Sequence, residues 1–323
     1  MDEQRARVIS QEKGSYRISS GADMKAAAVS GKYRYEAVTV SDYPAVGDYV
    51  LAQWPEDDAP AVIRSLFPRK SCFIRRAAGS AKQEQVVAAN IDTVLICMSL
   101  NQNYDLHRLE RYLAIAYDSG AAPVVVLTKA DLCRDVDSRV SEVRGAAPGV
   151  DILAVSSLSG DLGAVTRYIL PGRTVAFLGS SGVGRSTLIN QLTGTHSLAT
   201  GTVGAADKGR HTTTHRELIT LSNGAFLIDT PGMRELGMWD SGGGIDAAFR
   251  DVEGLARTCR FSNCTHTSEP GCAIQQALAD GTLDAARWRS FRKLKLEDRS
   301  AADNSRYQAA KRERARAGRK RHS

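Results

Sequence analysis

The residues whose types and spacing most clearly suggest chemistry run from position 179 to position 187 and read Gly-Ser-Ser-Gly-Val-Gly-Arg-Ser-Thr. An apolar run at 175–178 precedes them, and a run of helical character at 188–192 follows. A glycine-rich loop between a strand and a helix can turn several backbone N–H groups toward one point, and the helix N-terminus adds partial positive charge. The pattern therefore predicts a phosphate-binding loop. Its residues are Gly179, Ser180, Ser181, Gly182, Val183, Gly184, Arg185, Ser186 and Thr187.

Two side chains of this loop have individual roles in the prediction. Ser186 would place its hydroxyl on a magnesium ion, as the Ser or Thr of such loops does. The residue before it is normally Lys, and this chain has Arg185 there. Arg keeps the positive charge but is larger and planar. It could contact the phosphates in a displaced pose, or crowd the loop and lower the affinity for nucleotide.

A second motif, Thr128-Lys129-Ala130-Asp131, follows an apolar segment at 123–127. At such a position an Asp carboxylate can accept two hydrogen bonds from guanine, and the Lys stem can stack on the base, whereas adenine lacks the donor pair. Lys and Asp are also common helix caps, so the tetrapeptide alone is weak evidence. Ser156 and Ser157 follow the next predicted strand and could support the same base, although Ser-rich turns are ordinary.

Two further segments could complete the site. A long Gly- and Thr-rich stretch at 196–214 includes Thr213, which could complete magnesium coordination when a γ-phosphate is present. Asp229 ends a predicted strand, from which it could hold magnesium through water. The backbone N–H of Gly232 could then contact the γ-phosphate. In isolation, the sequence from Asp229 to Gly232 could also be only a turn.

A cysteine-rich segment contains Cys259, Cys264, His266 and Cys272. Three Cys and one His within such a short span suit tetrahedral zinc, with no position left for water. The segment therefore predicts one structural zinc ion that stiffens a loop-rich region. The alternative is four reduced side chains without a ligand.

The surrounding elements define the expected domains. Short alternating segments at 5–10, 15–19, 24–29, 48–54 and 61–67 predict an N-terminal β-barrel, such as an OB-fold, over residues 1–76. Residues 77–90 are expected to be a linker. Strands alternating with helices predict a parallel α/β domain over 91–240, and 241–323 are expected to hold the zinc segment and a basic helical end. Basic residues alternate with Phe67 and Phe73 in 64–76, which favours either an RNA-binding surface or a polar loop with buried aromatics.

The net charge of the 323-residue chain is +7, and the excess of basic residues lies between 285 and 323. This end could be a solvated helix and tail or an arm that binds nucleic acid. The N-terminal residues lack the apolar core of a signal peptide, and no apolar run reaches membrane-spanning length. A cytoplasmic protein that does not bind membranes, and is a monomer, is expected.

The base motifs precede the phosphate motifs along the chain, which a parallel sheet tolerates if the original termini lay close together. This order resembles the circularly permuted GTPases that depend on the small ribosomal subunit. The motifs that carry the resemblance are Gly209–Thr214, the sequence from Asp229 to Leu236, and the cysteine segment. It covers nearly the whole chain.

The resemblance implies an OB-fold, GTP and GDP as ligands with Mg²⁺, and one Zn²⁺. It also implies partners in the small ribosomal subunit and its rRNA, late maturation of that subunit as the role, and GTP hydrolysis that the subunit stimulates and that is coupled to release. In the family an apolar residue replaces the usual catalytic Gln, and Met233 fits that position. His211 would substitute by positioning the attacking water, unless it only organises its loop.

Two other functions remain open. One is a scaffold that binds the ribosome and guanine nucleotide but hydrolyses GTP poorly because of Arg185. The other is a zinc-stiffened RNA-binding module with a vestigial nucleotide site. The presence of Asp131, Ser186 and Asp229 together argues against the vestigial site.

Overall fold

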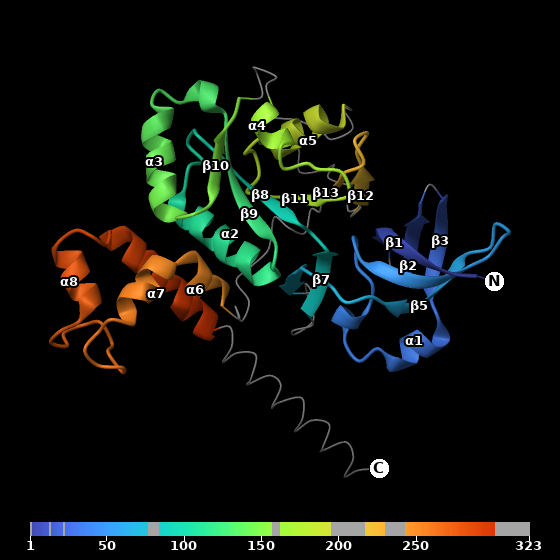
Figure 1. The fold of residues 1–323 in the computed structure, drawn as a ribbon, viewed down its shortest axis with the longest axis horizontal. Helices are drawn as coiled ribbons and strands as arrows, with labels where there is room; N and C mark the ends of the chain where they lie inside the picture. The colour runs from blue at the N-terminus through green and yellow to red at the C-terminus, as the bar shows by residue number, and fades with distance from the viewer. Residues whose placement is uncertain are drawn as a thin grey trace, which may run out of the picture. The chain divides into compact units, whose positions relative to one another are not determined.

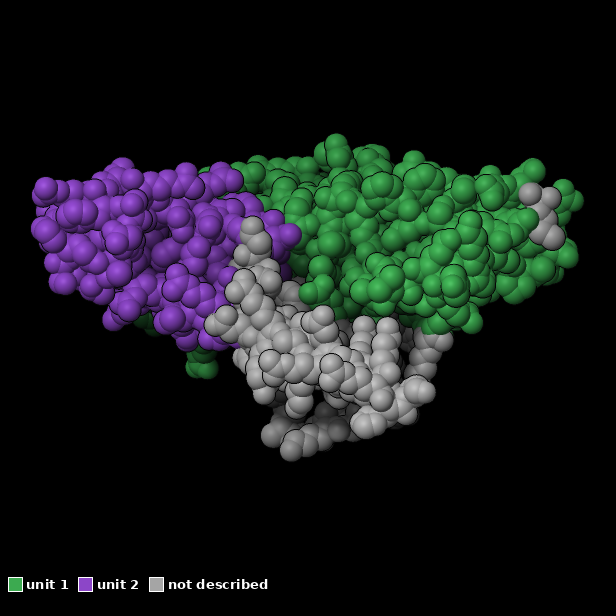
Figure 2. All heavy atoms as spheres, turned by 90° about the horizontal axis from the view of Figure 1, so that it is seen from below, with its two compact units in different colours: residues 1–105, 119–237 green, residues 106–118, 238–323 purple. Residues whose placement is uncertain are grey.

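The computed structural model describes residues 2–12, 14–21, 23–76, 84–156, 162–194, 217–229 and 243–300. The chain divides into two compact units, one of residues 1–105 and 119–237 and the other of residues 106–118 and 238–323. Figure 2 shows them in green and purple. The first unit contains a barrel and a sheet, and the second is helical (Figure 1).

The N-terminal barrel has five strands. They are β1 (Asp2–Glu12), β2 (Ser15–Ser20), β3 (Asp23–Val29), β4 (Tyr49–Trp54) and β5 (Ala61–Leu66). They pair in the order β1-β2-β3-β5-β4, and β4 pairs with β1 to close the barrel. Helix α1 (Gly31–Glu36) lies between β3 and β4 in the chain, and the side chain of Ser30 caps it. The predicted OB-type barrel is therefore confirmed.

Alternation of apolar and polar residues explains the barrel interior. Val8, Ile18, Val50 and Ile63 are fully buried, each on a different strand. Successive side chains of a strand point to opposite faces, so the residues next to these four along each strand point away from the barrel interior.

The sheet of the first unit has the order β10-β9-β8-β11-β13-β12. Its strands are β8 (Thr93–Ser99), β9 (Ala122–Thr128), β10 (Asp151–Ala154), β11 (Thr174–Leu178), β12 (Glu217–Thr220) and β13 (Phe226–Asp229). All neighbours run parallel except β12, which is antiparallel to β13. The carboxyl ends of the five parallel strands therefore lie at one edge, where open α/β sheets bind ligands.

The helices that accompany these strands in the first unit are α3 (Val136–Ala146), α4 (Gly163–Thr166), α5 (Arg185–Thr193) and the short 3-10 turn η2 (Ala130–Leu132). Most residues of β8, β9 and β11 are buried. Continuous apolar strands of this kind are typical of a parallel sheet covered on both faces. The predicted α/β domain is confirmed.

Residues 84–89 differ from the predicted linker. They form β7 (Glu84–Ala89), which pairs antiparallel with β6 (Cys72–Arg76). Val87 and Phe73 are buried in this ribbon. The buried Phe73 therefore cannot be the exposed aromatic of an RNA-binding surface, whereas Phe67 is 37% exposed.

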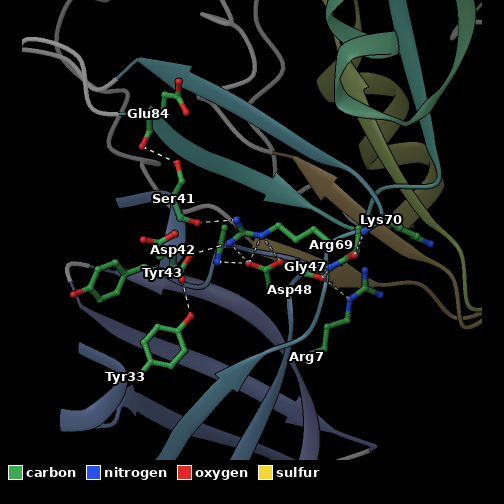
Figure 3. Close-up of polar contacts among 12 residues, drawn as sticks. Arg7, Tyr33, Ser41, Asp42, Tyr43, Gly47, Asp48, Arg69, Lys70 and Glu84 are labelled. Carbon is green, nitrogen blue, oxygen red and sulfur yellow. Dashed lines mark hydrogen bonds and ion pairs between the residues drawn. The ribbon is translucent and has the colours of Figure 1, made fainter. Parts of the chain in front are cut away.

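A polar network fixes the segments between barrel and ribbon (Figure 3). Asp48 is fully buried, and its carboxylate accepts hydrogen bonds from Nε and Nη2 of Arg69, the shortest at 2.7 Å. Arg69 also donates to the backbone oxygens of Ser41 and Tyr43, at 2.8 and 2.9 Å. A buried ion pair with this many hydrogen bonds fixes geometry, because loss of one partner would leave a buried charge.

The second unit contains α2 (Leu106–Ser119), α6 (Gly244–Ala248), α7 (Arg250–Ala256), α8 (Ala273–Ala279) and helical residues 285–300. The last residue of α2, Ser119, is assigned to the first unit. Nη1 of Arg287 donates to Glu110 of α2 at 3.0 Å, and both side chains are buried. Residues 273–297 do not form one continuous helix: α8 ends at Ala279, and Gly281 has a φ of +78°, the left-handed conformation common after helix ends.

In the part of the chain that the structure describes, no helix combines the length and the apolar character needed to cross a membrane.

Candidate nucleotide site and metal centre

The backbone of the 179–184 loop requires glycine at three places. Gly179, Gly182 and Gly184 have φ angles of +152°, +78° and +94°. A Cβ on Gly179 would also lie 2.5 Å from the backbone oxygen of Cys97 on β8. The loop thus passes directly over the central strands and leads into α5. Such a loop can curl its N–H groups around an anion without side chains in the way.

The loop leads into the first turn of α5, which contains Arg185, Ser186 and Thr187. The first N–H groups of a helix have no partner within the helix and are therefore available to a ligand. Arg185 is only 4% exposed, while Ser186 and Thr187 are half-buried. The hydroxyl of Ser186 is thus in the helix turn that faces bound phosphate in loops of this type.

The base motif lies at the end of β9, and two of its side chains contact the phosphate loop. Oγ1 of Thr128 donates to the backbone oxygen of Val183 at 2.5 Å. Nζ of Lys129 donates to the backbone oxygen of Gly182 at 2.8 Å. Lys129 has a φ of +57°, a rare conformation for a residue with a side chain. The structure therefore brings together two motifs that are about fifty residues apart in the chain.

Asp131 lies in η2 with Ala130, beyond the end of β9. Oγ of Ser156 donates to Oδ1 of Asp131 at 2.5 Å, and the backbone N–H of Ala130 donates to the oxygen of Val155 at 3.1 Å. Ser156 follows β10, the neighbour of β9. These contacts orient one oxygen of the Asp131 carboxylate.

The remaining predicted nucleotide residues are not all described. Asp229 is the last residue of β13, the strand next to β11, so its backbone lies at the same sheet edge as the phosphate loop. Ser157, His211, Thr213 and Gly232 lie outside the described residues.

One contact of the phosphate loop was not predicted from the sequence. Nδ2 of Asn103, in the turn after β8, donates to Oγ of Ser180 and to the backbone oxygen of Ser181, both at 3.2 Å. Asn103 belongs to no motif with a known spacing. The only signal in the sequence is its position shortly after a strand of the parallel sheet, where ligand-binding residues gather.

The four zinc candidates lie together in the second unit. Their ligand atoms are all within 4.8 Å of one another. Sγ of Cys259 lies 3.5 Å from Nδ1 of His266 and 4.0 Å from Sγ of Cys272, and Sγ of Cys272 lies 3.6 Å from Nδ1 of His266. Tetrahedral zinc with its usual bond lengths separates two sulfurs by about 3.8 Å and sulfur from nitrogen by about 3.6 Å. The donor set therefore fits a structural zinc ion.

Contacts around these ligands fix the loop that carries them. His266 has a φ of +59°, and Gln275 of α8 donates to its backbone oxygen at 2.6 Å. The Glu269 carboxylate accepts hydrogen bonds from Thr265 and from the backbone of Thr267, which hold the pKa of Glu269 well below its usual range. The ring of Trp288 lies edge-on to His266 with centroids 5.7 Å apart. Outer contacts of this kind orient metal ligands.

A glycine loop between a parallel strand and a helix, contacted by the motif at 128–131 at the carboxyl edge of the sheet, is typical of a phosphate-loop nucleotide-binding protein. The sequence matches the RsgA GTPase family over residues 66–239. It is also 46% identical over 302 residues to the small ribosomal subunit biogenesis GTPase RsgA 2 of Lactiplantibacillus plantarum, which covers 93% of this chain and 85% of that protein. The chain therefore belongs to the RsgA GTPase family, and it is a GTPase.

Two solved structures have the same fold. YjeQ from Thermotoga maritima superposes with a TM-score of 0.68 at 23% identity, covering 92% of this chain and 98% of that one. YloQ, described as a circularly permuted GTPase, superposes with a TM-score of 0.67 at 23% identity, covering 93% and 96%. Membership of a GTPase family implies guanine nucleotide and Mg²⁺ as ligands, and the geometry of the glycine loop fits the phosphates.

Proposed function

We propose that this GTPase acts in late maturation of the small ribosomal subunit, that the subunit stimulates its hydrolysis of GTP, and that hydrolysis is coupled to release. The observation that carries the nucleotide part is the pair of contacts from Thr128 and Lys129 to the phosphate loop. The ribosomal part is supported by the L. plantarum relative, whose name includes small-subunit biogenesis. In this role the protein acts as a cytoplasmic monomer.

Each residue of the proposed site is assigned a role. Asp131 reads the guanine edge, with Ser156 orienting its carboxylate and Ser157 supporting the base. Residues Gly179 to Thr187 hold the phosphates. Mg²⁺ supplies charge neutralisation at the phosphates when bound, and Ser186, Thr213 and Asp229 are its proposed protein contacts, Asp229 through water.

The hydrolytic step needs an oriented water and stabilisation of charge on the phosphates. His211 is proposed to position the water, and the N–H of Gly232 to contact the γ-phosphate. Arg185 supplies positive charge beside the β- and γ-phosphates from the first turn of α5. Loss of the γ-phosphate would release the segments around Thr213 and Gly232, which is the usual basis of a GTP-dependent switch.

One observation favours a second candidate function. Arg185 is nearly fully buried at the start of α5, where a smaller Lys is usual. A guanidinium confined there could bind the phosphates in a geometry that supports binding better than turnover. The protein would then be a ribosome-bound scaffold that holds guanine nucleotide and hydrolyses it poorly.

A turnover measurement separates the two functions. GTP hydrolysis is followed with and without purified small ribosomal subunits, for the native protein and for Arg185→Lys, which keeps the charge and shortens the group. We expect the subunits to stimulate both proteins at least about tenfold, because a partner that completes a GTPase site can raise turnover by that much or more. If native turnover stays at background with subunits while Arg185→Lys restores it, the scaffold function replaces the enzymatic one.

A further inference from the structure

The turn that follows β8 is held in one shape by its own hydrogen bonds. Oδ1 of Asn101 accepts from Oγ of Ser99 at 2.8 Å and from the backbone N–H of Asn103 at 3.0 Å. The backbone oxygen of Asn101 accepts from the N–H of Tyr104 at 3.0 Å. An Asn side chain that bonds the backbone two residues later is a recurrent turn-forming device. The backbone of Asn103 is therefore fixed before any ligand binds.

From this turn, Asn103 contacts the phosphate loop with the donor side of its amide. The two hydrogen bonds of Nδ2, to Oγ of Ser180 and to the backbone oxygen of Ser181, match the two N–H groups of a carboxamide. Ser181 and Gly182 are exposed, and Gly182 has a φ of +78°. This part of the loop has little packing to hold it, so side-chain contacts determine its orientation.

Three consecutive carbonyl oxygens of the loop are held by side chains from outside it. Asn103 donates to the oxygen of residue 181, Lys129 to that of 182, and Thr128 to that of 183. In a trans peptide the C=O and the following N–H point in opposite directions. Fixing these three oxygens therefore directs the N–H groups of residues 182, 183 and 184 to the other side, the inside of the loop.

We propose that Asn103 is a positioning residue of the phosphate loop, which completes this row of donors and turns the N–H of Gly182 toward the phosphates. The inference rests on the proposed assignment of residues 179–187 as the phosphate-binding loop. Converging N–H groups repel one another when no anion is present, so an unbraced peptide at 181–182 would turn over part of the time. Because Asn103 holds the peptide in the binding orientation, nucleotide binding does not have to supply the free energy of turning it. The site is thus preorganised.

The test measures GDP and GTP affinity with fluorescent nucleotide analogues for the full-length native protein and for Asn103→Ala, Asn103→Asp and Gln102→Ala. Asn103→Ala removes the donors, while Asn103→Asp keeps the shape and offers an acceptor instead. Gln102 is exposed in the same turn and serves as the matched control. We expect the Kd of both nucleotides to rise about five- to tenfold for Asn103→Ala, the effect of losing the one hydrogen bond that orients the 181–182 peptide, and at least as much for Asn103→Asp. Gln102→Ala should change it less than twofold.

Two further readouts distinguish positioning from general stability. The urea midpoint without nucleotide should be the same for Asn103→Asp and native protein. The KM for GTP should rise by the same factor as the Kd while kcat changes little, because the contact stabilises the ground state and the transition state equally. If the native protein binds GDP and both Asn103 variants bind it with a Kd within twofold of the native value, the inference is wrong. If the native protein binds no guanine nucleotide, the proposed site itself fails and the inference with it.

Discussion

Asp92 shows how one carboxylate joins two strands at the edge of the sheet opposite the nucleotide site. It lies just before β8 and accepts hydrogen bonds from Nζ of Lys70 at 2.6 Å, from Nη1 of Arg173 at 2.8 Å and from the backbone N–H of Thr174 at 2.8 Å. Its side chain is only 11% exposed. Burial opposes the charge, but the donors, first that of Lys70, outweigh it and lower the pKa of Asp92.

This pKa makes stability depend on pH in a defined direction. A carboxyl group whose pKa is lowered in the folded state stabilises the fold above its unfolded pKa of about 3.9, and that contribution is lost as the pH falls through the folded pKa. We expect Asp92→Asn to lower the free energy of unfolding by about 1–2 kcal/mol at pH 7, a modest cost because Lys70 and Arg173 are exposed. The difference from native protein should begin to shrink as the pH falls below about 4, and it should be lost as the pH falls through the lower pKa of folded Asp92, where the native side chain also becomes neutral.

Urea unfolding at a series of pH values from 7 downward measures this difference. Asp58→Asn is the control, because Asp58 is an exposed loop carboxylate. A loss of stability that is the same at every pH would show that Asp92 acts through shape and not through charge.

Among the elements, the barrel and the sheet are joined through Arg7 of β1. Nη2 of Arg7 donates to Oγ1 of Thr174 on β11 at 2.5 Å, and the guanidinium lies 4.4 Å from the ring centre of Phe226 on β13 and 5.0 Å from that of Tyr49 on β4. Arg7 is 6% exposed, and burial lowers its pKa. Its Nη1 makes no hydrogen bond within the described part of the chain. Nε of Arg7 donates a longer hydrogen bond, 3.4 Å, to the backbone oxygen of Gly47, so the buried guanidinium depends strongly on the closer acceptor at Thr174.

A double-mutant cycle tests that dependence. Thr174→Val keeps the shape of a buried strand residue but removes the acceptor, so we expect it to cost about 1–3 kcal/mol in the native background. In an Arg7→Met background, where no charge needs the acceptor, the same change should cost less than about 0.5 kcal/mol. The coupling between the two sites should then be at least about 1 kcal/mol. Urea unfolding measures these free energies. If Thr174→Val lowers the free energy of unfolding equally in both backgrounds, Arg7 does not depend on the Thr174 hydroxyl.

For the molecule as a whole, local patterns predicted the elements and tertiary contacts decided what the sequence left open. The barrel strands, the apolar parallel strands and the glycine loop follow from short-range periodicity and backbone requirements. The strand at 84–89 begins with the polar Glu84 and Gln85, and it exists because β6 pairs with it. Strand formation of this kind depends on a partner more than on propensity.

The same distinction holds for the sites. The candidate zinc ligands and the phosphate loop each lie within one short segment, so residue types, spacing and local context were enough to predict them. Asn103 meets Ser181 across 78 residues, and Glu110 of α2 meets Arg287 across 177. A pattern within one sequence does not predict contacts between residues so far apart in the chain. This is why the contact of Asn103 with the phosphate loop and the membership of α2 in the second unit were found only in the structure.

A zinc ion held by the four candidate ligands would constrain the loop-rich part of the second unit. Between α7 and α8, residues 257–272 contain no strand or α-helix, and the four candidate ligands come from that segment. The free energy of metal binding contributes directly to the folding of such a segment, because the site does not exist in the unfolded chain. Removing the ion should therefore unfold this region and leave the nucleotide site of the first unit, which has its own core, able to bind.

Cys264→Ser tests this separation, with Cys133→Ser as the control because Cys133 lies outside the cluster. We expect bound zinc to fall from about one ion per chain to near zero after dialysis against a chelator, since structural sites need all four ligands. Amide hydrogen exchange should accelerate in residues 257–279, while GDP affinity stays within about twofold of native. If GDP affinity fell together with zinc content, the two units would depend on each other for folding. Zinc that remained after Cys264→Ser would show that Cys264 is not one of its ligands.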